Sequence, residues 1–324
     1  MTFDTPILIV AWKRPDKIHR IINSIRNIKP QNIYIACDGA NKENYIEIKK
    51  VENTREIIEK EINWQYHKLE KLYSKKNLGC KLAVSKAIDW FFKNVEEGII
   101  IEDDCLPHQD FFEFAAKMLE RYREDNRIWC ISGSNLQNGR INGNSSYYFS
   151  YYPLVWGWAT WKRCWDEYDL KMNSWPIFKK NKFLYNCFDS KREVRFWEKK
   201  FDILYNFNKP DTWDYQWLYC CLKNNGLSII PNVNLIENIG FGLDATHTTS
   251  KTLSPAIIKN FQANSSGVLP IRNPENIVRS KNADKYLALN YFSGYPISSH
   301  NFYINLLKRV LDKLKRFIKD NNKI

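Results

Sequence analysis

The chain has 324 residues, of which 44% are hydrophobic and 15% aromatic, and its 49 Lys and Arg outnumber its 36 Asp and Glu to give a net charge of +13. This much apolar material can bury a sizeable core, which excludes a mainly disordered or collagen-like chain. No apolar run approaches the roughly 18 residues of a membrane span, and the first residues lack the basic segment and cleavage site of a secretory signal. We therefore expect a cytoplasmic protein with one large domain or two smaller ones.

Strand and helix patterns alternate through the first part of the chain. Apolar runs predict strands at 6–12, 32–37, 98–101 and 129–132. Apolar residues at helical spacing, or a charged helical composition, predict helices at 16–28, 42–69, 78–95 and 111–125. Uninterrupted apolar strands separated by helices favour an α/β fold with a Rossmann-like, mostly parallel sheet flanked by helices.

The composition changes after this first part. Residues 133–146 have the composition of a loop, and residues 147–175 are dense in Tyr and Trp. Aromatic rings of this kind either fill a core or line a cavity. We expect one domain over 1–250, with halves at 1–132 and 147–250, followed by a C-terminal extension over 251–300.

The last 24 residues, 301–324, combine one apolar helical face with seven Lys or Arg and two Asp, so 7 − 2 gives a net charge of +5. A basic amphipathic helix of this kind suits an anionic membrane surface. The same pattern also fits a helix that packs on its own domain. Peripheral attachment to the cytosolic face of a membrane is therefore one of two interpretations.

The eight cysteines form no CxxC pair, and no His stands at zinc-ligand spacing from them. Most lie in apolar surroundings. We expect buried, reduced cysteines rather than a disulfide framework or a zinc site.

Carboxylates stand where two predicted strands end. Asp38 directly follows the second strand, and Glu102-Asp103-Asp104 directly follows the third. Ligands bind beyond the carboxyl ends of parallel strands, and adjacent carboxylates repel one another unless a cation neutralises them. Hard oxygen ligands favour Mg²⁺ or Mn²⁺, which take substrate phosphates as further ligands. The chain has neither a GxxxxGK[ST] loop nor a complete dinucleotide fingerprint, so a metal and side chains would have to hold any phosphates.

Several segments, in their order along the chain, resemble the N-acetylglucosaminyltransferase I-like family of inverting sugar transferases, which have a GT-A fold. Glu102-Asp103-Asp104 and the residues that follow it look like the metal-binding segment of this family. Trp213-Asp214-Tyr215 resembles its Trp-Asp-Asp catalytic segment, and the stretch from Ile239 to His247 resembles its Phe-Gly…Ser-His stretch. Asn77-Leu-Gly-Cys-Lys81 and Trp156-Gly-Trp-Ala-Thr-Trp161 are similar to related bacterial nucleotide-diphospho-sugar transferases. The resemblance spans about residues 5–250.

The resemblance implies a metal-dependent inverting glycosyltransferase that uses a nucleoside-diphosphate sugar, in particular a UDP-sugar. The acceptor would be a saccharide or a lipid-linked saccharide, as in surface polysaccharide synthesis. It implies that Mn²⁺ or Mg²⁺ binds Asp104 and that Asp214 is the general base. The donor would be held by Arg14, Asp38, Lys81, Glu102 and Asp103, and the acceptor by Trp156, Trp158, Trp213 and His247. Tyr215 departs from the family, which has a second Asp at this position.

Other classes of protein fit the residues less well. The positive net charge suggests nucleic-acid binding, but the basic residues form no RNA-binding motif, so we expect no nucleic-acid partner. A catalytically inactive glycan-binding module would not need Glu102-Asp103-Asp104 together with Asp214. A metal-dependent sugar nucleotidyltransferase is the nearest enzymatic alternative, but it usually needs a glycine-rich basic loop, which Ala11-Trp-Lys-Arg-Pro15 does not provide.

Overall fold

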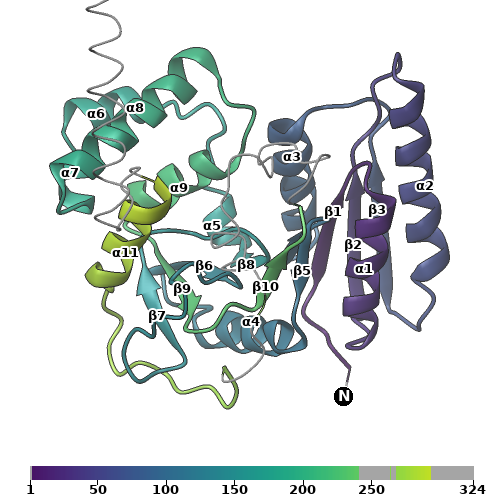
Figure 1. Cartoon of the computed structure of the whole chain (residues 1–324), viewed down its shortest axis with the longest axis horizontal. Helices are drawn as coiled ribbons and strands as arrows, with labels where there is room; N and C mark the ends of the chain where they lie inside the picture. Colours follow the sequence, from purple (N-terminus) through teal and green to yellow (C-terminus); the bar gives the residue numbers. More distant parts are fainter. Residues whose placement is uncertain (1, 241–262, 264–267, 293–324) are drawn as a thin grey trace, which may run out of the picture.

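The computed structural model describes residues 2–240, 263 and 268–292 of the chain (Figure 1). His247 and the basic segment 301–324 lie outside these residues. The expectations placed on them therefore remain expectations.

The centre of the protein is an eight-stranded sheet in the order β3-β2-β1-β4-β8-β6-β9-β7. The strands are β1 (Ile7–Ala11), β2 (Asn32–Cys37), β3 (Lys68–Tyr73), β4 (Glu97–Glu102), β6 (Ile128–Ser132), β7 (Tyr147–Ser150), β8 (Trp158–Trp161) and β9 (Leu227–Pro231). Only β8 and β7 are antiparallel to their neighbours, so the other six of the eight strands share one direction. The predicted α/β fold with a mostly parallel sheet is confirmed. A separate two-stranded ribbon pairs β5 (Cys105–Pro107) with β10 (Ile236–Asn238).

Helices cover both faces of this sheet, as predicted. The helices of the described residues are α1 (Pro15–Arg26), α2 (Tyr45–Glu61), α3 (Cys80–Phe92), α4 (Gln109–Arg121), α5 (Lys162–Trp165), α6 (Trp175–Lys180), α7 (Leu184–Cys187), α8 (Lys191–Phe207), α9 (Asp214–Lys223), α11 (Lys281–Leu287) and the π-helix η1 (Ala288–Phe292). Of these, α6 and α7 pack on α8. Strand β8 shows the two faces clearly, because side chains alternate along a strand. The Trp158 ring packs on Trp217 of α9, whereas Trp161 Nε1 donates to the Leu119 carbonyl of α4.

The expectation of one helix over 42–69 is wrong at its C-terminal end. Helix α2 ends at Glu61, and residues 68–73 form β3 at the edge of the sheet. An edge strand has a single partner and a largely solvated surface, so Glu70 and Lys71 are exposed and β3 carries no continuous apolar run. Its charged sequence therefore looked helical.

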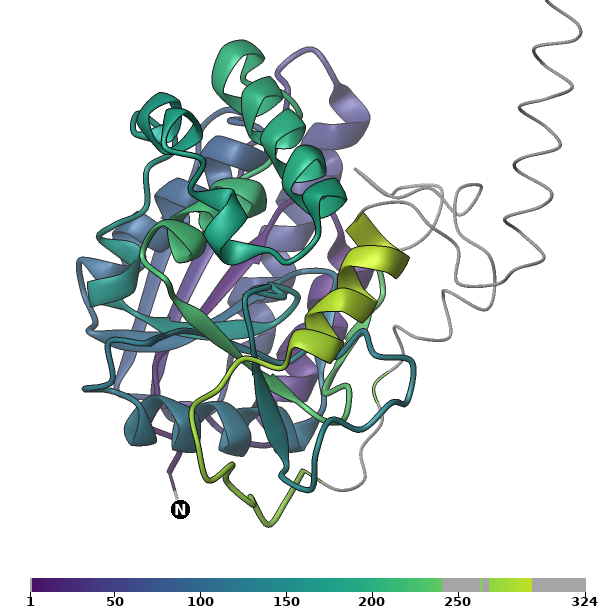
Figure 2. The same ribbon diagram turned by 90° about the vertical axis from the view of Figure 1, so that its left-hand side faces the viewer.

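The described part of the C-terminal extension packs along β7. The Ser146 amide donates to the Arg272 carbonyl at 2.8 Å, and the Ser280 amide donates to the Phe149 carbonyl at 2.8 Å. Helix α11 follows directly, and Figure 2 shows it, in yellow-green, on the β7 side of the molecule. Residues far apart in the sequence thus meet at this edge of the sheet.

Candidate functional site

A cavity of about 810 Å³ opens where β1, β2 and β4 end. Its lining begins with Asp38 after β2, then Trp12 and Arg14 after β1, and then Glu102-Asp103-Asp104 at the end of β4. The sheet places β2, β1 and β4 side by side and parallel, so their carboxyl ends meet at one edge. The predicted ligand crevice is therefore formed by residues from three consecutive strands of the sheet.

Arg14 holds two of the carboxylates together. Its Nη1 donates to Asp103 Oδ1 at 2.8 Å and to Asp104 Oδ2 at 2.7 Å. Burial alone would lower the pKa of the guanidinium, but the charges of Asp103 and Asp104 and their hydrogen bonds together outweigh burial and raise it. Arg14 therefore stays charged and serves as an internal cation at the edge of the sheet.

The remaining oxygen of Asp103 and the neighbouring Glu102 complete this cluster. The Trp12 amide donates to Asp103 Oδ2 at 2.9 Å. Burial raises the pKa of Asp103, and Arg14 opposes this rise. Burial also raises the pKa of Glu102 well above its ordinary value, and the charges of Asp104, Asp103 and then Asp214 add to this rise. The carboxyl groups of this cluster therefore outnumber the single positive charge of Arg14.

Asp38 joins two loops of the cavity. Its Oδ1 accepts the Gly39 amide at 2.8 Å, and its Oδ2 accepts the Leu78 amide at 3.0 Å. Burial raises the pKa of Asp38, and these amide donors oppose that rise. Asp38 therefore holds the loop before α3 against the end of β2.

Asp214 is the first residue of α9 and lines the same cavity. The Thr212 hydroxyl donates to its Oδ1. A helix N-terminus favours a negative side chain, since the helix dipole is positive there. The structure thus brings the predicted base into one cavity with the carboxylate cluster, 110 residues away from Asp104 in the sequence.

The loop before Asp214 is attached to the N-terminus of α3. Asp211 Oδ1 accepts the Lys81 amide at 3.3 Å, while Lys81 Nζ donates to Asn208 Oδ1 at 2.6 Å and to the Asn208 carbonyl at 3.1 Å. Gly79 adopts φ = +80°, and a Cβ there would lie 2.7 Å from Asp211 Oδ2. The buried Lys81 does not line the cavity. Its ammonium holds the α8–α9 loop instead.

The predicted acceptor residues lie in different environments. Trp156 and Trp213 line the cavity, although Trp213 is only 2% exposed. Trp158 is fully buried, stacks on Trp213 with ring centroids 5.5 Å apart, and does not line the cavity. Its ring belongs to the core and offers no face to a sugar in this structure. His247 lies outside the described residues.

Other lining residues were not singled out by the sequence analysis. Tyr291 and Phe292 of η1 close one end of the cavity, and Asn238 and Gly240 pass beside Asp104. The Ile239 amide donates to the Asp104 carbonyl at 2.8 Å. For the segment that contains Asn238 and Gly240, the only sequence signal was the resemblance of the stretch from Ile239 to His247 to the sugar transferase family. Nothing in the sequence marked η1.

The cavity offers oxygen ligands for a divalent cation, although no group of three or more His, Cys, Asp or Glu side chains in the described part of the chain is arranged to hold one. The Asp104 side chain is 23% exposed and lies beside Gly240, where a Cβ would come within 2.5 Å of Oδ2. Mg²⁺ typically binds through one or two carboxylates, keeps several waters and takes substrate phosphates. The residues present fit such a site, in which Asp104 could serve as the protein ligand.

No protein-family model matches the sequence, and no curated protein matches it. Solved structures are similar at a low level. A cytidylyltransferase from Leptospira borgpetersenii serovar Hardjo-bovis is 11% identical with a TM-score of 0.33, over 52% of this chain and 64% of that one. S. aureus TarS 1–349 is 13% identical with a TM-score of 0.34, over 51% of this chain and 49% of that one. A UDP-glucose pyrophosphorylase complexed with UDP-glucose is 11% identical with a TM-score of 0.33, over 51% of this chain and 78% of that one. Similarity at this level carries no argument about activity.

Within residues 2–240, 263 and 268–292, no helix has the length and apolar character needed to cross a membrane.

Proposed function

We propose that this chain is a metal-dependent inverting glycosyltransferase that uses a nucleoside-diphosphate sugar, in particular a UDP-sugar, and a saccharide acceptor. The observation that supports the proposal most is the placement of Asp214 in one cavity with Asp103 and Asp104 and their counter-ion Arg14. Donor groups and a base then lie on the same surface, as a direct transfer between two bound substrates requires.

The donor would bind at the β2-β1-β4 side of the cavity. The planar guanidinium of Arg14 suits a diphosphate, which it can bind through two nitrogens at once. Asp38, Glu102 and Asp103 provide acceptors for the hydroxyl and N–H groups of a nucleoside. Asp104 would hold Mn²⁺ or Mg²⁺, which as a Lewis acid stabilises the charge of the departing diphosphate. Lys81 would act indirectly, through the Asn208 contact described above.

Asp214 would act as the general base. An acceptor hydroxyl is about as weakly acidic as water, so its proton can leave only as the bond between its oxygen and the anomeric carbon forms. Asp214 takes that proton while the bond from the anomeric carbon to the diphosphate oxygen breaks. Attack from the side opposite the leaving group inverts the anomeric centre. One base suffices, and no covalent intermediate on the protein is needed.

The products distinguish this proposal from its alternatives. A glycosyltransferase releases the nucleoside diphosphate, whereas a sugar nucleotidyltransferase, given a nucleoside triphosphate and a sugar 1-phosphate, releases pyrophosphate. We would screen nucleotide sugars by thermal unfolding with Mn²⁺, with Mg²⁺ and with EDTA, because a bound ligand raises the melting temperature. Product analysis on the stabilising donor then decides. Pyrophosphate release from a nucleoside triphosphate and a sugar 1-phosphate, or glycan binding without turnover of any nucleotide sugar, would overturn the proposal.

A location at the membrane is proposed from the sequence of residues 301–324 alone. Each basic residue near an anionic surface adds about 1 kcal/mol to binding, and the segment carries a net charge of +5. Attachment to the cytosolic face would bring the enzyme to lipid-linked saccharide acceptors. Flotation with anionic liposomes, comparing the full chain with one that ends at Ser299, tests this. Equal failure of both chains to float at low salt would contradict it.

A further inference from the structure

We propose that η1 and Trp156 form the acceptor end of the cavity, and that the acceptor is a saccharide whose ring stacks on Tyr291 and Trp156. This inference rests on the proposed function. It adds the residues that select the acceptor, and it assigns a role to a C-terminal segment that the sequence left unexplained.

The order of the strands separates the two ends of the cavity. Along the sheet, the lining residues follow the order Asp38 after β2, Arg14 after β1, Glu102 at the end of β4, Trp156 before β8 and Leu136 after β6. Strand β8 is antiparallel to β4 and β6, so its beginning lies at the edge where they end. The charged groups therefore gather at the β2-β1-β4 end. The other end is apolar.

The apolar end is walled by aromatic rings that are only partly buried. Trp156, Tyr215, Tyr291 and Phe292 all line the cavity there and all keep some exposed surface. Sugar rings have apolar C–H faces and polar hydroxyl edges, and binding pockets meet them with aromatic side chains beside a few polar groups. Asp214 and Thr212 provide such polar groups at the junction with the charged end. A saccharide fits this combination, and a second nucleotide does not, because Arg14 already lies at the opposite end.

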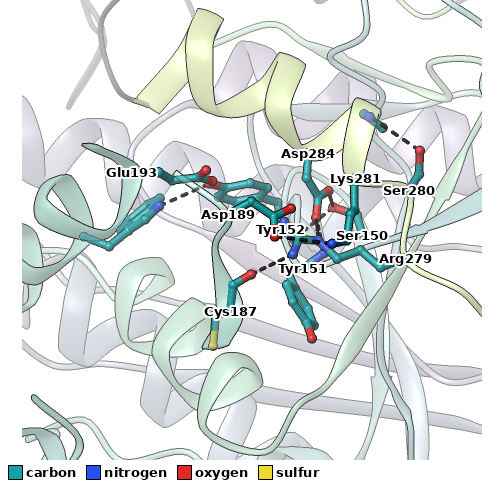
Figure 3. A network of polar contacts seen from close by, with 12 residues as sticks. Ser150, Tyr151, Tyr152, Cys187, Asp189, Glu193, Arg279, Ser280, Lys281 and Asp284 are labelled. Carbon is teal, nitrogen blue, oxygen red and sulfur yellow. Dashed lines mark hydrogen bonds and ion pairs between the residues drawn. The ribbon is translucent and has the colours of Figure 1, made fainter. Parts of the chain in front are cut away.

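The η1 wall is anchored through Phe292. Its ring stacks on Tyr152, with centroids 4.7 Å apart and planes at 18°. Tyr152 is in turn fixed by two polar contacts, since its hydroxyl donates to Glu193 Oε1 and accepts from Trp197 Nε1 (Figure 3). One face of the Phe292 ring is thus held by the core, and the neighbouring Tyr291 packs against the same cluster and lines the cavity.

A second set of contacts fixes the segment before η1. The carboxylate of Asp284 is fully buried and accepts hydrogen bonds from the Ser150 hydroxyl, the Tyr151 amide and Arg279 Nε (Figure 3). Arg279 also donates through Nη1 to the Cys187 carbonyl at 2.6 Å. These contacts join α11 to β7 and to the end of α7. The wall is therefore in place before any ligand binds, and a preformed wall lowers the entropic cost of binding.

The test replaces Tyr291 and a matched aromatic residue of the same segment. We expect Tyr291→Ala to raise the KM for the saccharide acceptor about tenfold, as loss of roughly one stacked ring predicts, while donor affinity stays at the wild-type value. Tyr286→Ala is the control, because that half-buried ring packs on Arg140 and lies outside the cavity. It should leave both parameters unchanged. Phe292→Leu keeps apolar volume against Tyr152 and provides a second variant that should fold.

A direct binding measurement separates this inference from the proposed function. Saturation-transfer NMR of free mono- and disaccharides with the full chain needs no donor and no turnover. Saccharide contacts that disappear in Tyr291→Ala and persist in Tyr286→Ala support the aromatic subsite, even if no nucleotide sugar is ever turned over. Unchanged acceptor KM and unchanged saccharide contacts in both Tyr291→Ala and Phe292→Leu would overturn it. If Tyr291→Ala weakened the binding only of acceptors that carry an apolar aglycone, Tyr291 would contact the aglycone, and the assignment to a saccharide ring would be overturned.

Discussion

Arg14 and Asp104 are joined by a hydrogen bond of 2.7 Å between Nη1 and Oδ2, at the oxygen that lies beside Gly240. The same nitrogen also binds Asp103 at 2.8 Å. Arg14 therefore neutralises part of the negative charge of Asp103 and Asp104, which would otherwise attract a divalent cation and repel a diphosphate. When a donor binds, its phosphates offer Arg14 a second set of oxygens.

Removing Arg14 should make the protein depend on a divalent cation. We expect Arg14→Ala to lower the free energy of unfolding by about 3 kcal/mol in EDTA, the lower end of the range for a broken buried pair, since Asp104 remains partly exposed. Mn²⁺ should restore part of this loss. Chemical denaturation with and without Mn²⁺ measures both effects. Lys117→Ala is the control, because Lys117 pairs with Glu113 on the exposed surface of α4, outside the cavity, and should cost less than about 1 kcal/mol. Equal losses in the two variants would contradict the prediction.

A methyl group at Gly240 should disturb the proposed metal ligand without touching the core. In Gly240→Ala the new Cβ would lie 2.5 Å from Asp104 Oδ2 and 3.0 Å from Asn238 Oδ1, so the Asp104 carboxylate must move. We expect Mn²⁺ binding to weaken, as measured by calorimetry or by electron paramagnetic resonance of the ion.

Asp104→Ala should abolish metal-dependent donor binding altogether while the melting temperature changes little. Undiminished donor affinity of the wild-type chain in EDTA would remove Asp104 from this role.

The sequence predicts four of the eight strands of the sheet and misses β3, β7, β8 and β9. Strands β7, β8 and β9 are buried, but β7 and β8 lie in the aromatic-rich stretch, which shows no uninterrupted aliphatic run. Strands β1, β2, β4 and β6 are almost wholly buried, and this produces the apolar runs from which they were predicted. Strand β3 is an edge strand with exposed Glu70 and Lys71, so its sequence carries no such run. The carboxylates at the ends of β2 and β4 could be placed for the same reason, because their strands were placed correctly.

The sequence cannot separate cavity aromatics from core aromatics. Trp156 and Trp158 stand two residues apart, yet the first lines the cavity and the second is fully buried. The alternation of a strand would put both on one face, but β8 begins only at Trp158 and Gly157 has φ = +61°. Tyr291 reaches the cavity only through tertiary contacts such as that of Asp284 with Ser150, 134 residues apart, for which no local pattern exists.

The pH dependence of stability should show the buried Glu193. Burial raises its pKa to about 7 from 4.5, and the Tyr152 hydroxyl and Arg279 oppose that rise. Since the folded state keeps its proton to higher pH than the unfolded state, the stability from this group is complete below about pH 4.5 and is lost as the pH rises through 7. We expect the wild-type chain to lose free energy of unfolding, on the order of 3 kcal/mol, relative to Glu193→Gln between pH 5 and 8.

Denaturant unfolding of both proteins across this range measures the difference. Glu198→Gln, a substitution of a partly exposed residue on the same helix, is the control and should follow the wild-type curve. Parallel curves for the wild-type chain and Glu193→Gln would mean that Glu193 titrates alike in the folded and unfolded states.

Asp211 should act by position and not as a base. It accepts the Lys81 amide at the start of α3, a contact that an asparagine carbonyl can also make. We therefore expect Asp211→Asn to transfer sugar at close to the wild-type rate, whereas Asp211→Ala should lower the free energy of unfolding by roughly 1 kcal/mol, as for a lost helix cap. Steady-state kinetics and thermal unfolding measure the two effects. A large loss of kcat in Asp211→Asn would make Asp211 the base.

Asp214→Asn tests the chemical step itself. The asparagine carbonyl can still accept the Thr212 hydroxyl, so the start of α9 should keep its geometry, but the amide cannot take a proton from the acceptor. Donor affinity, measured by calorimetry with Mn²⁺, should equal that of the wild-type chain. The rate of transfer should fall by roughly 10²–10⁴-fold, the usual effect of losing a general base.

Asp211→Asn is the matched control, since it makes the same chemical change three residues away in the lining of the same cavity. A fall in kcat at unchanged donor affinity, seen in Asp214→Asn and absent from Asp211→Asn, assigns proton transfer to Asp214. A normal rate in Asp214→Asn would mean that another group removes the proton.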